Sequence, residues 1–416
     1  MCRVHVLVLP YPAQGHVKPL MELSCELVKH DENRNCLENL TESIREVMPN
    51  KLEKLIQEIN ESDSEKISCV VADGSMGWAL ELAEKMRVRR ALFWPASASL
   101  LALPFSIPEL LHDGIIDTDG TPAKDQIIHL APKFPAMRTK HFVWTQISDY
   151  LSAQKVVFNY MIRNNKAAKI VDWVICNSTH KLEPSAFAFA PQILPIGPLQ
   201  AIKRNHSENL AGSFWPEDST CLNWLDQQTD KSVTYIAFGS FTILDLTQLQ
   251  ELALALELSN EPFLWAVRSD INNGAIYDFL KAFEDRLSSH GKIVGWAPQQ
   301  KVLKHPSIAC FLSHCGWNST LEGAINGVPF LCWPYFADQF LKETYICDIW
   351  KVGLRLNRRN DRIISHEEIA FKIKQAIHDK GFRASASELQ EKVINCVQEG
   401  GSSNKHLKNF VDWIKA

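Results

Sequence analysis

The chain has 416 residues, of which 46% are hydrophobic and 22% are charged, and its formal net charge is −4. These values are typical of a globular protein with room for two domains, and they give no reason to expect a nucleic-acid partner. The opening apolar run ends at Pro10 and the eleven cysteines are scattered, which indicates no signal peptide, no membrane anchor and no disulfide framework. We therefore expect a cytoplasmic protein, monomeric by default, without stable membrane insertion.

Strands and helices alternate along the first half of the chain, which favours a parallel α/β sheet. The short apolar runs that predict its strands are residues 4–9, 67–72, 90–95, 171–177 and 193–197. His16 follows the first of these strands and Asp73 ends the second. Because open α/β sheets bind ligands at the carboxyl ends of their strands, both side chains are candidates for a site. The alternatives are a histidine that only satisfies the backbone and an aspartate that caps the next helix.

Two features of the middle of the chain have ordinary explanations. Asp117 and Asp119 form a D-x-D triplet, which binds metal in some enzymes, but the surrounding HDGIIDTDGTP has the chemistry of turns. We therefore predict a solvated loop there and no metal site. The aromatic residues Phe142, Trp144 and Tyr150 favour packing in a core, with contacts to a small molecule as the alternative.

A polar stretch without periodicity, residues 199–220, predicts a linker between two domains. The first domain is then 1–198 and the second 221–400. In the second, a strand over 232–238 leads to Ser240 in a sharp turn, where backbone amides are suited to phosphate. The last residues, 401–416, predict an amphipathic helix.

The most informative stretch runs from Trp296 to Gln339. Residues 308–313 are apolar and rich in strand formers, and a tight turn at 314–316 leads into a helix for which Asn318, Ser319 and Thr320 offer N-cap chemistry. A strand–turn–helix step of this kind gathers free backbone N–H groups and the positive end of a helix, and phosphate binds at such places. The pattern predicts a pocket for a nucleoside diphosphate.

Over these 44 consecutive positions, from WAPQ through HCGWNSTLEG to FADQ, the sequence resembles the signature box of the plant secondary-product UDP-glycosyltransferases. The resemblance extends more loosely over nearly the whole chain. It implies that the donor-binding residues are, from the base to the sugar, Trp296 on uracil, Ala297 and Gln299 on the base and ribose side, Glu322 on the ribose, Ser240, His314, Asn318 and Ser319 on the diphosphate, and Trp317, Asp338 and Gln339 on the sugar. A glutamine at position 339 is the family's weak indicator of glucose.

The resemblance also implies the fold and the reaction. The fold is GT-B, two doubly wound Rossmann-like α/β domains that face each other across a cleft, with the final helix crossing back onto the first domain. The reaction is transfer of glucose from UDP-glucose to a hydroxyl of a small lipophilic acceptor such as a flavonoid, another phenolic, a terpenoid or a hormone. His16 is the implied general base, Asp73 orients it, and no metal or cofactor is implied beyond the UDP-glucose donor.

The chain departs from the family after His30. A glycine turn, a second parallel strand and a further helix and strand are expected there, but the charged, helix-patterned stretch up to Ile67 contains no strand candidate. A strand–helix–strand unit needs roughly 30 or more residues, so a segment of that size is predicted to be missing. Pro95 also replaces a threonine that many relatives carry, and Ser97 is a possible substitute.

Two other function classes are compatible with parts of the pattern. The first is a non-catalytic UDP-binding protein, in which the shortened first domain no longer supports transfer. The second is a Rossmann oxidoreductase, which needs a G-x-G-x-x-G after a strand and an acidic residue beyond it, and the sequence contains none.

Overall fold

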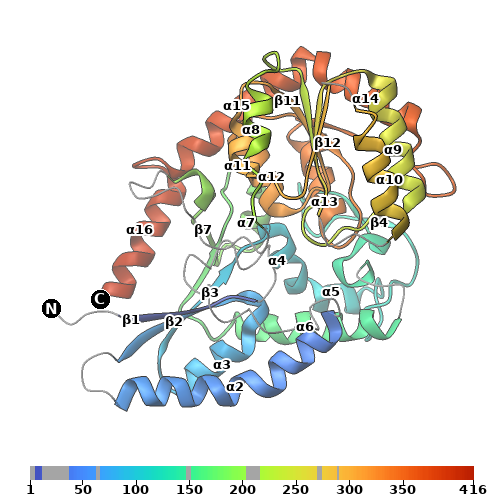
Figure 1. Cartoon of the computed structure of the whole chain (residues 1–416). Coiled ribbons are helices and arrows are strands. Elements are labelled where there is room, and N and C mark those ends of the chain that lie inside the picture. The colour runs from blue at the N-terminus through green and yellow to red at the C-terminus, as the bar shows by residue number, and fades with distance from the viewer. Residues whose placement is uncertain are drawn as a thin grey trace. The chain divides into compact units, whose positions relative to one another are not determined.

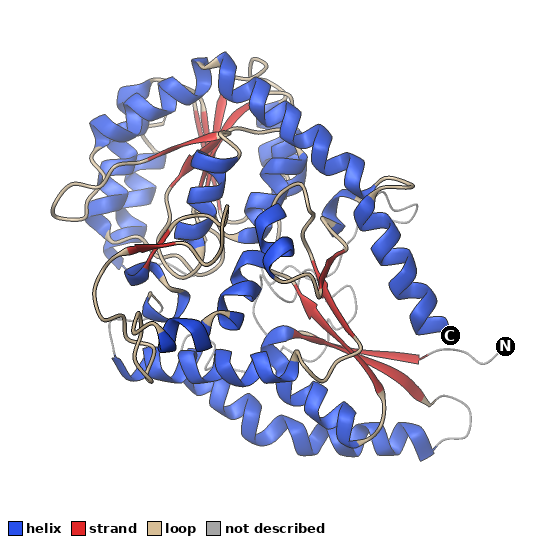
Figure 2. Cartoon of the chain, turned by 180° about the vertical axis from the view of Figure 1, so that it is seen from behind, coloured by secondary structure: helices blue, strands red, loops and turns tan. Residues whose placement is uncertain are grey.

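The computed structural model describes residues 5–11, 37–61, 66–146, 151–202, 216–268, 274–287 and 290–416. The chain divides into two compact units. One comprises Met1–Gly212 together with Asn395–Ala416, and the other is Ser213–Ile394. Each unit has a parallel sheet with helices on its faces, so the prediction of two Rossmann-like α/β domains is confirmed (Figure 1, Figure 2).

The first unit is built on a five-stranded sheet of order β1-β2-β3-β6-β7, in which every neighbouring pair is parallel. Its strands are β1 (His5–Leu9), β2 (Ile67–Asp73), β3 (Arg89–Trp94), β6 (Trp173–Cys176) and β7 (Ile193–Pro195). Its helices are α2 (Leu37–Glu61), α3 (Gly77–Lys85), α4 (Ala98–Phe105), α5 (Ile107–His112), α6 (Leu151–Ala167), α7 (Pro184–Phe189) and α16 (Ser402–Lys415). A short hairpin, β4 (Ile127–Ile128) and β5 (Met137–Arg138), lies between α5 and α6.

Strand β1 pairs directly with β2, the next described strand of the chain, with Leu9 opposite Ala72. Between them the structure describes α2, which agrees with the helical pattern of that segment. The sheet therefore has β1 at one edge of its described strands. Residues 12–36, which include His16, lie outside the described part of the chain, so the predicted loss of a strand–helix–strand segment stays a prediction.

The final helix, α16, packs against the sheet of the first unit. Phe410 is buried in a cluster with residues of β2, β3 and β6, and Leu407 and Ile414 pack against it, as the helical pattern predicts. Trp413 joins this contact, and its ring lies 5.9 Å from that of Trp173. In both views α16 lies on the side of this sheet opposite to α2 and α3 (Figure 1, Figure 2).

Substitution of Phe410 by leucine is expected to lower the free energy of unfolding of the first unit by about 1 kcal/mol. The substitution keeps an apolar side chain but removes the edge-on contact with the ring of Trp173, whose centroid is 5.6 Å away. Urea unfolding followed by tryptophan fluorescence measures the change. Asn409→Ala, on the exposed face of the same helix, is the control and should leave the transition unmoved; an equal shift in both variants contradicts the prediction.

The second unit has a six-stranded sheet of order β10-β9-β8-β11-β12-β13, again with parallel neighbours throughout. Its strands are β8 (Val233–Ala237), β9 (Phe263–Ala266), β10 (Gly291–Val294), β11 (Ile308–Ser313), β12 (Phe330–Cys332) and β13 (Gly353–Arg355). Its helices are α8 (Thr220–Leu225), α9 (Leu246–Ser259), α10 (Gly274–Glu284), α11 (Gln299–Lys304), α12 (Trp317–Ile325), α13 (Gln339–Thr344), α14 (His366–His378) and α15 (Lys380–Val397), with a π-helical turn over Tyr345–Ile349.

Most predicted strands lie within one or two residues of those observed, but the predicted start of α12 is wrong. The N-cap residue is Gly316, and no side chain caps the helix. Asn318, Ser319 and Thr320 lie inside its first turn. Cys315 adopts a positive φ of 65°, which closes the turn over His314–Gly316. The helix can therefore begin at Trp317.

The D-x-D triplet has the turn structure that the sequence predicts. The Asp117 carboxylate accepts hydrogen bonds from the backbone N–H groups of Asp119 and Thr121 at 2.9 and 2.8 Å. Phe142 and Trp144 are buried, which confirms their place in a core. Within the described ranges, no helix is long and apolar enough to cross a membrane, and no three His, Cys, Asp or Glu side chains gather as a metal site requires.

Candidate functional site

The order of strands in the second unit identifies where a ligand binds. The chain runs outward from β8 to β9 and β10, then returns to place β11 on the other side of β8. In an open α/β sheet, ligands bind at such a switch point, outside the carboxyl ends of the two central strands. Ala237 and Ser313 are paired at those ends. The turns that follow them contain Ser240 and His314, so both predicted diphosphate residues lie at the switch point.

His314 packs between the two turns. A Cβ atom on Gly239 would lie 2.6 Å from its Nε2 atom, and a Cβ atom on Gly316 would lie 2.3 Å from the same atom. Gly239 also has a positive φ of 71°, which L side chains rarely adopt. Both glycines are therefore required for the close approach of the imidazole to the backbone.

The imidazole of His314 is uncharged at neutral pH. Burial lowers its pKa to about 4, although the nearby Asp338 acts in the opposite direction. Its Nδ1 atom is buried, and an interaction of the ring with the Ala237 backbone also acts to raise its pKa. A neutral imidazole can donate one N–H to an anionic oxygen, and backbone amides of the two turns can supply further donors.

The free energy of unfolding is expected to fall as the pH drops from 6.5 towards 4, with a contribution from His314 of about 2 kcal/mol at pH 4.5. The pKa of this base is lower in the folded than in the unfolded state, so protons bind preferentially to the unfolded chain in that window. The stabilisation is fully present above pH 6.5 and is lost on acidification. Denaturant titrations of the wild type and His314→Gln at pH 7 and pH 4.5 measure it. A difference between the two proteins that does not vary with pH contradicts the prediction.

A buried network joins the start of α11 to α12. Glu322 is 2% exposed, and its two carboxylate oxygens accept from the side-chain amides of Gln299 at 2.6 Å and Gln300 at 3.2 Å. Gln299 also donates to the Ser319 hydroxyl at 2.9 Å and accepts from the Tyr235 hydroxyl at 3.2 Å. The structure thus brings together three residues that were predicted to hold the nucleotide, and the network fixes the Glu322 carboxylate beside α11.

The predicted base-binding residues lie just before α11. Trp296 is partly exposed, and its carbonyl accepts a hydrogen bond from the Asp218 N–H at 2.7 Å. Ala297 is 5% exposed. Because its side chain is a methyl group, only its backbone can form hydrogen bonds with a ligand. The hydrogen bond from Asp218 fixes the backbone at Trp296, close to Gln299 in the chain.

Two of the predicted sugar-binding residues, Asp338 and Gln339, follow β12, and the third, Trp317, precedes it. The Gln339 side chain is 4% exposed, and its amide oxygen accepts from the backbone N–H groups of Tyr335 and Phe336 at 2.7 and 3.1 Å. Its remaining polar group is therefore the amide nitrogen, which only donates. Trp317 is buried at the start of α12, and Asp338 is the N-cap residue of α13.

Asp73 lies in the first unit, at the carboxyl end of β2. It is completely buried, and its carboxylate accepts from the Ser75 N–H at 2.7 Å, so it caps the short helix that follows. The Tyr160 hydroxyl donates to the Ser75 carbonyl in the same turn. The capping role considered for Asp73 is thus present. The position of Asp73 relative to His16 stays a prediction, because His16 is outside the described residues.

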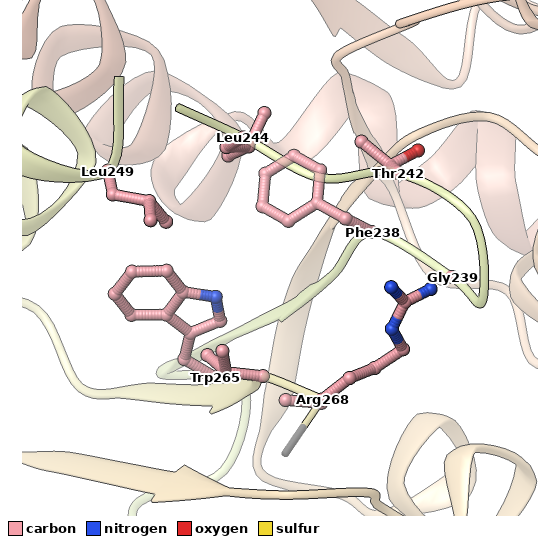
Figure 3. A pocket seen from close by; sticks show the side chains of 9 residues that line it. Phe238, Gly239, Thr242, Leu244, Leu249, Trp265 and Arg268 are labelled. Carbon is pink, nitrogen blue, oxygen red and sulfur yellow. The ribbon is translucent and has the colours of Figure 1, made fainter. Parts of the chain in front are cut away.

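Sequence reasoning missed several residues of the site in the second unit. Tyr235 donates to Gln299, Gln300 donates to Glu322, and Gly239 and Gly316 make room for His314. A small cavity of about 30 Å³ also lies beside the Gly239 turn, between Phe238, Trp265, Thr242 and Arg268. Figure 3 shows the Arg268 guanidinium directed towards Gly239. Glycine after a strand was the available signal for the turn, whereas the supporting contacts depend on segments far apart in the sequence.

Comparison with known proteins agrees with the predicted nucleotide-binding site. Residues 209–391 match the protein family described as "UDP-glucoronosyl and UDP-glucosyl transferase". The chain is 42% identical to UDP-glycosyltransferase 83A1 of Arabidopsis thaliana, over all of this chain and 98% of that protein. The alignment runs over 465 positions, more than the 416 residues of this chain, so parts of that relative have no counterpart here.

Solved structures resemble the whole chain as well. A UDP-glucosyltransferase from Polygonum tinctorium matches with a TM-score of 0.82 at 24% identity, with 99% of each chain covered. UGT2 of Phytolacca americana, in complex with UDP-2-fluoro-glucose and pterostilbene, matches with a TM-score of 0.78 at 25% identity over the full length of both chains. The fold predicted from the sequence, GT-B, is confirmed by these neighbours.

Proposed function

Because the chain belongs to the plant UDP-glycosyltransferase family, we propose that it transfers glucose from UDP-glucose to a hydroxyl of a small, largely apolar acceptor. The observation that carries this proposal is the switch point of the second unit, where the turns after β8 and β11 meet around His314. Backbone amides and a neutral imidazole lie together there, and the two turns contain no lysine or arginine. Such a site suits a diphosphate that leaves with growing negative charge.

The donor is proposed to lie along the residues in the order that the resemblance implies. Uracil stacks on the indole of Trp296, and the Glu322 carboxylate, fixed by Gln299 and Gln300, accepts hydrogen bonds from the two ribose hydroxyls. Asn318 and Ser319, in the first turn of α12, contact the diphosphate with Ser240 and His314. The sugar then meets Trp317, Asp338 and the donor nitrogen of Gln339. Glucose is the proposed sugar because UGT2 of Phytolacca americana was solved with UDP-2-fluoro-glucose and because residue 339 is glutamine.

The transfer itself is proposed to be a single displacement. His16 removes the proton of the acceptor hydroxyl, and Asp73 stabilises the imidazolium that forms. The acceptor oxygen attacks the anomeric carbon from the side opposite the leaving UDP, so the product is a β-glucoside. The contribution of the second unit is electrostatic, since His314 and the amides of both turns stabilise the charge that develops on the diphosphate.

The experiment that tests the function measures UDP release from UDP-glucose by the purified full-length chain, with phenolic, flavonoid and terpenoid acceptors and with no acceptor. Calorimetric titration with UDP runs in parallel. Release that requires an acceptor, with a glucoside of matching mass, supports the proposal. Tight UDP binding without acceptor-dependent release across the panel contradicts it and favours the non-catalytic UDP-binding protein.

A further inference from the structure

A buried lysine lies next to the predicted sugar-binding residues. Lys342, on α13, is 0% exposed, and its ammonium nitrogen lies 2.7 Å from Oδ2 of Asp338, four residues earlier in the chain. The same nitrogen is 5.9 Å from the ring centre of Trp317. Lysine is among the residue types least often found fully buried, and a buried charge is costly unless it is paired. The Lys342 charge therefore needs an explanation beyond filling space, which methionine would do.

The ion pair orients one carboxylate in the site. The Asp338 side chain is 17% exposed while that of Lys342 is fully covered, so the carboxylate lies on the outer side of the pair. The ammonium lies within ion-pair distance of Oδ2 but makes no well-aligned hydrogen bond among the described residues, and a carboxylate has further lone pairs that can accept from a ligand. Asp338 also lies close enough to His314 to affect its pKa. The carboxylate thus lies near both a buried cation and a predicted diphosphate residue.

The two neighbours of the pair are fixed as well. Gln339 is tied to the backbone N–H groups of Tyr335 and Phe336, and Ala337 has a positive φ of 54° that turns the chain just before Asp338. The backbone around Asp338 is therefore held by the turn, whereas its side-chain direction is held by Lys342.

We propose that Lys342 is a positioning residue of the donor-sugar subsite, which acts by pairing with Asp338 and so directing its carboxylate towards the sugar hydroxyls. This inference rests on the proposed role of Asp338 in binding the sugar. The recorded contacts of Lys342 are with Asp338 and Trp317, both predicted sugar-binding residues, so we expect its main effect on the sugar part of the donor. UDP, which lacks the sugar, should not be sensitive to Lys342.

The test is a double-mutant cycle in the full-length chain with Lys342→Met, Asp338→Asn and the double variant. Methionine keeps an unbranched side chain of similar length and removes the charge. The control is Lys392→Met, which breaks an exposed ion pair with Glu388 on α15. Calorimetry gives Kd for UDP and for UDP-glucose, steady-state kinetics give KM and kcat, and thermal unfolding reports folding.

We expect Lys342→Met to weaken UDP-glucose binding about tenfold, with a matching rise in KM, while Kd for UDP changes less than about twofold. In the Asp338→Asn background the same substitution should change neither value, because the carboxylate through which Lys342 acts is gone. Lys392→Met should match the wild type. Equal losses of affinity for UDP and UDP-glucose, or a full tenfold effect in the Asp338→Asn background, overturn the proposal.

Two further comparisons allow the result to be interpreted if a variant does not fold or if the wild type shows no turnover. If Lys342→Met does not fold because it leaves an unpaired carboxylate, the comparison of Asp338→Asn with the double variant still measures whether the ammonium acts independently of Asp338. If the wild type shows no acceptor-dependent turnover, the proposed function fails. The calorimetric comparison of UDP with UDP-glucose then still decides the role of Lys342.

Discussion

Replacement of His16 by alanine is expected to lower kcat for glucosyl transfer about a thousandfold and to leave Kd for UDP unchanged. Strands β1 and β2 are parallel neighbours with Leu9 opposite Ala72. The carboxyl end of β1 therefore lies at the same end of the sheet as Asp73. The predicted donor-binding residues all belong to the other unit. Loss of the general base should therefore affect the chemical step and not the nucleotide.

Asp73→Asn is the companion variant for this prediction. Asparagine caps helices as well as aspartate does, so the hydrogen bond from the Ser75 N–H is kept while the negative charge is lost. Asp73→Asn should then lower kcat with unchanged thermal stability. If His16→Ala loses UDP binding together with turnover, or if it retains the wild-type kcat, the assignment of His16 as the base is wrong.

Replacement of Gly316 by alanine is expected to weaken UDP binding roughly ten- to hundredfold, the result of about 1–3 kcal/mol of overpacking. Gly316 has φ −64° and ψ 147°, a conformation open to alanine, so the effect is steric and not one of backbone strain. The new methyl group would lie 2.3 Å from Nε2 of His314, and the imidazole would have to leave its place between the two turns.

Gly274→Ala provides a matched control for Gly316→Ala. Gly274 also stands at the start of a helix, α10, but no atom lies within 4 Å of the position that its Cβ would take. Isothermal titration with UDP should give the wild-type Kd for this variant. Similar Kd values for Gly316→Ala and Gly274→Ala would show that the position of His314 does not matter for the nucleotide.

Much of the architecture could be predicted from the sequence because strand formers in short runs and glycine turns are local signals. Residues 308–313 were predicted as a strand, and β11 has those bounds. The start of α12 could not be predicted in the same way. Three residues with N-cap chemistry follow the turn, yet the positive φ of Cys315 lets the helix begin before them. Local propensity was overridden there by the backbone conformation of the turn, with Gly316 as the N-cap residue.

The supporting contacts of the site were beyond prediction for a different reason. The spacing of Asp338 and Lys342 is visible in the sequence, and it fits an ordinary exposed pair on a helix. What distinguishes the pair is the complete burial of the ammonium, which depends on the packing of α13 against α12. The same holds for Glu322, because its partners Gln299 and Gln300 lie more than 20 residues earlier in the chain.

The packing of α16 on the first sheet has a consequence for biosynthesis. The first unit combines Met1–Gly212 with Asn395–Ala416, and its sheet buries Phe93 and Ile175 against α16, which the ribosome makes long after the strands. The second unit, Ser213–Ile394, is complete earlier and can fold while the apolar face awaits its cover. At about 5–20 residues per second, the roughly 200 residues after β7 take about 10–40 s to translate. During that interval the apolar face of the first sheet lacks this cover, which raises the risk of aggregation for the nascent chain.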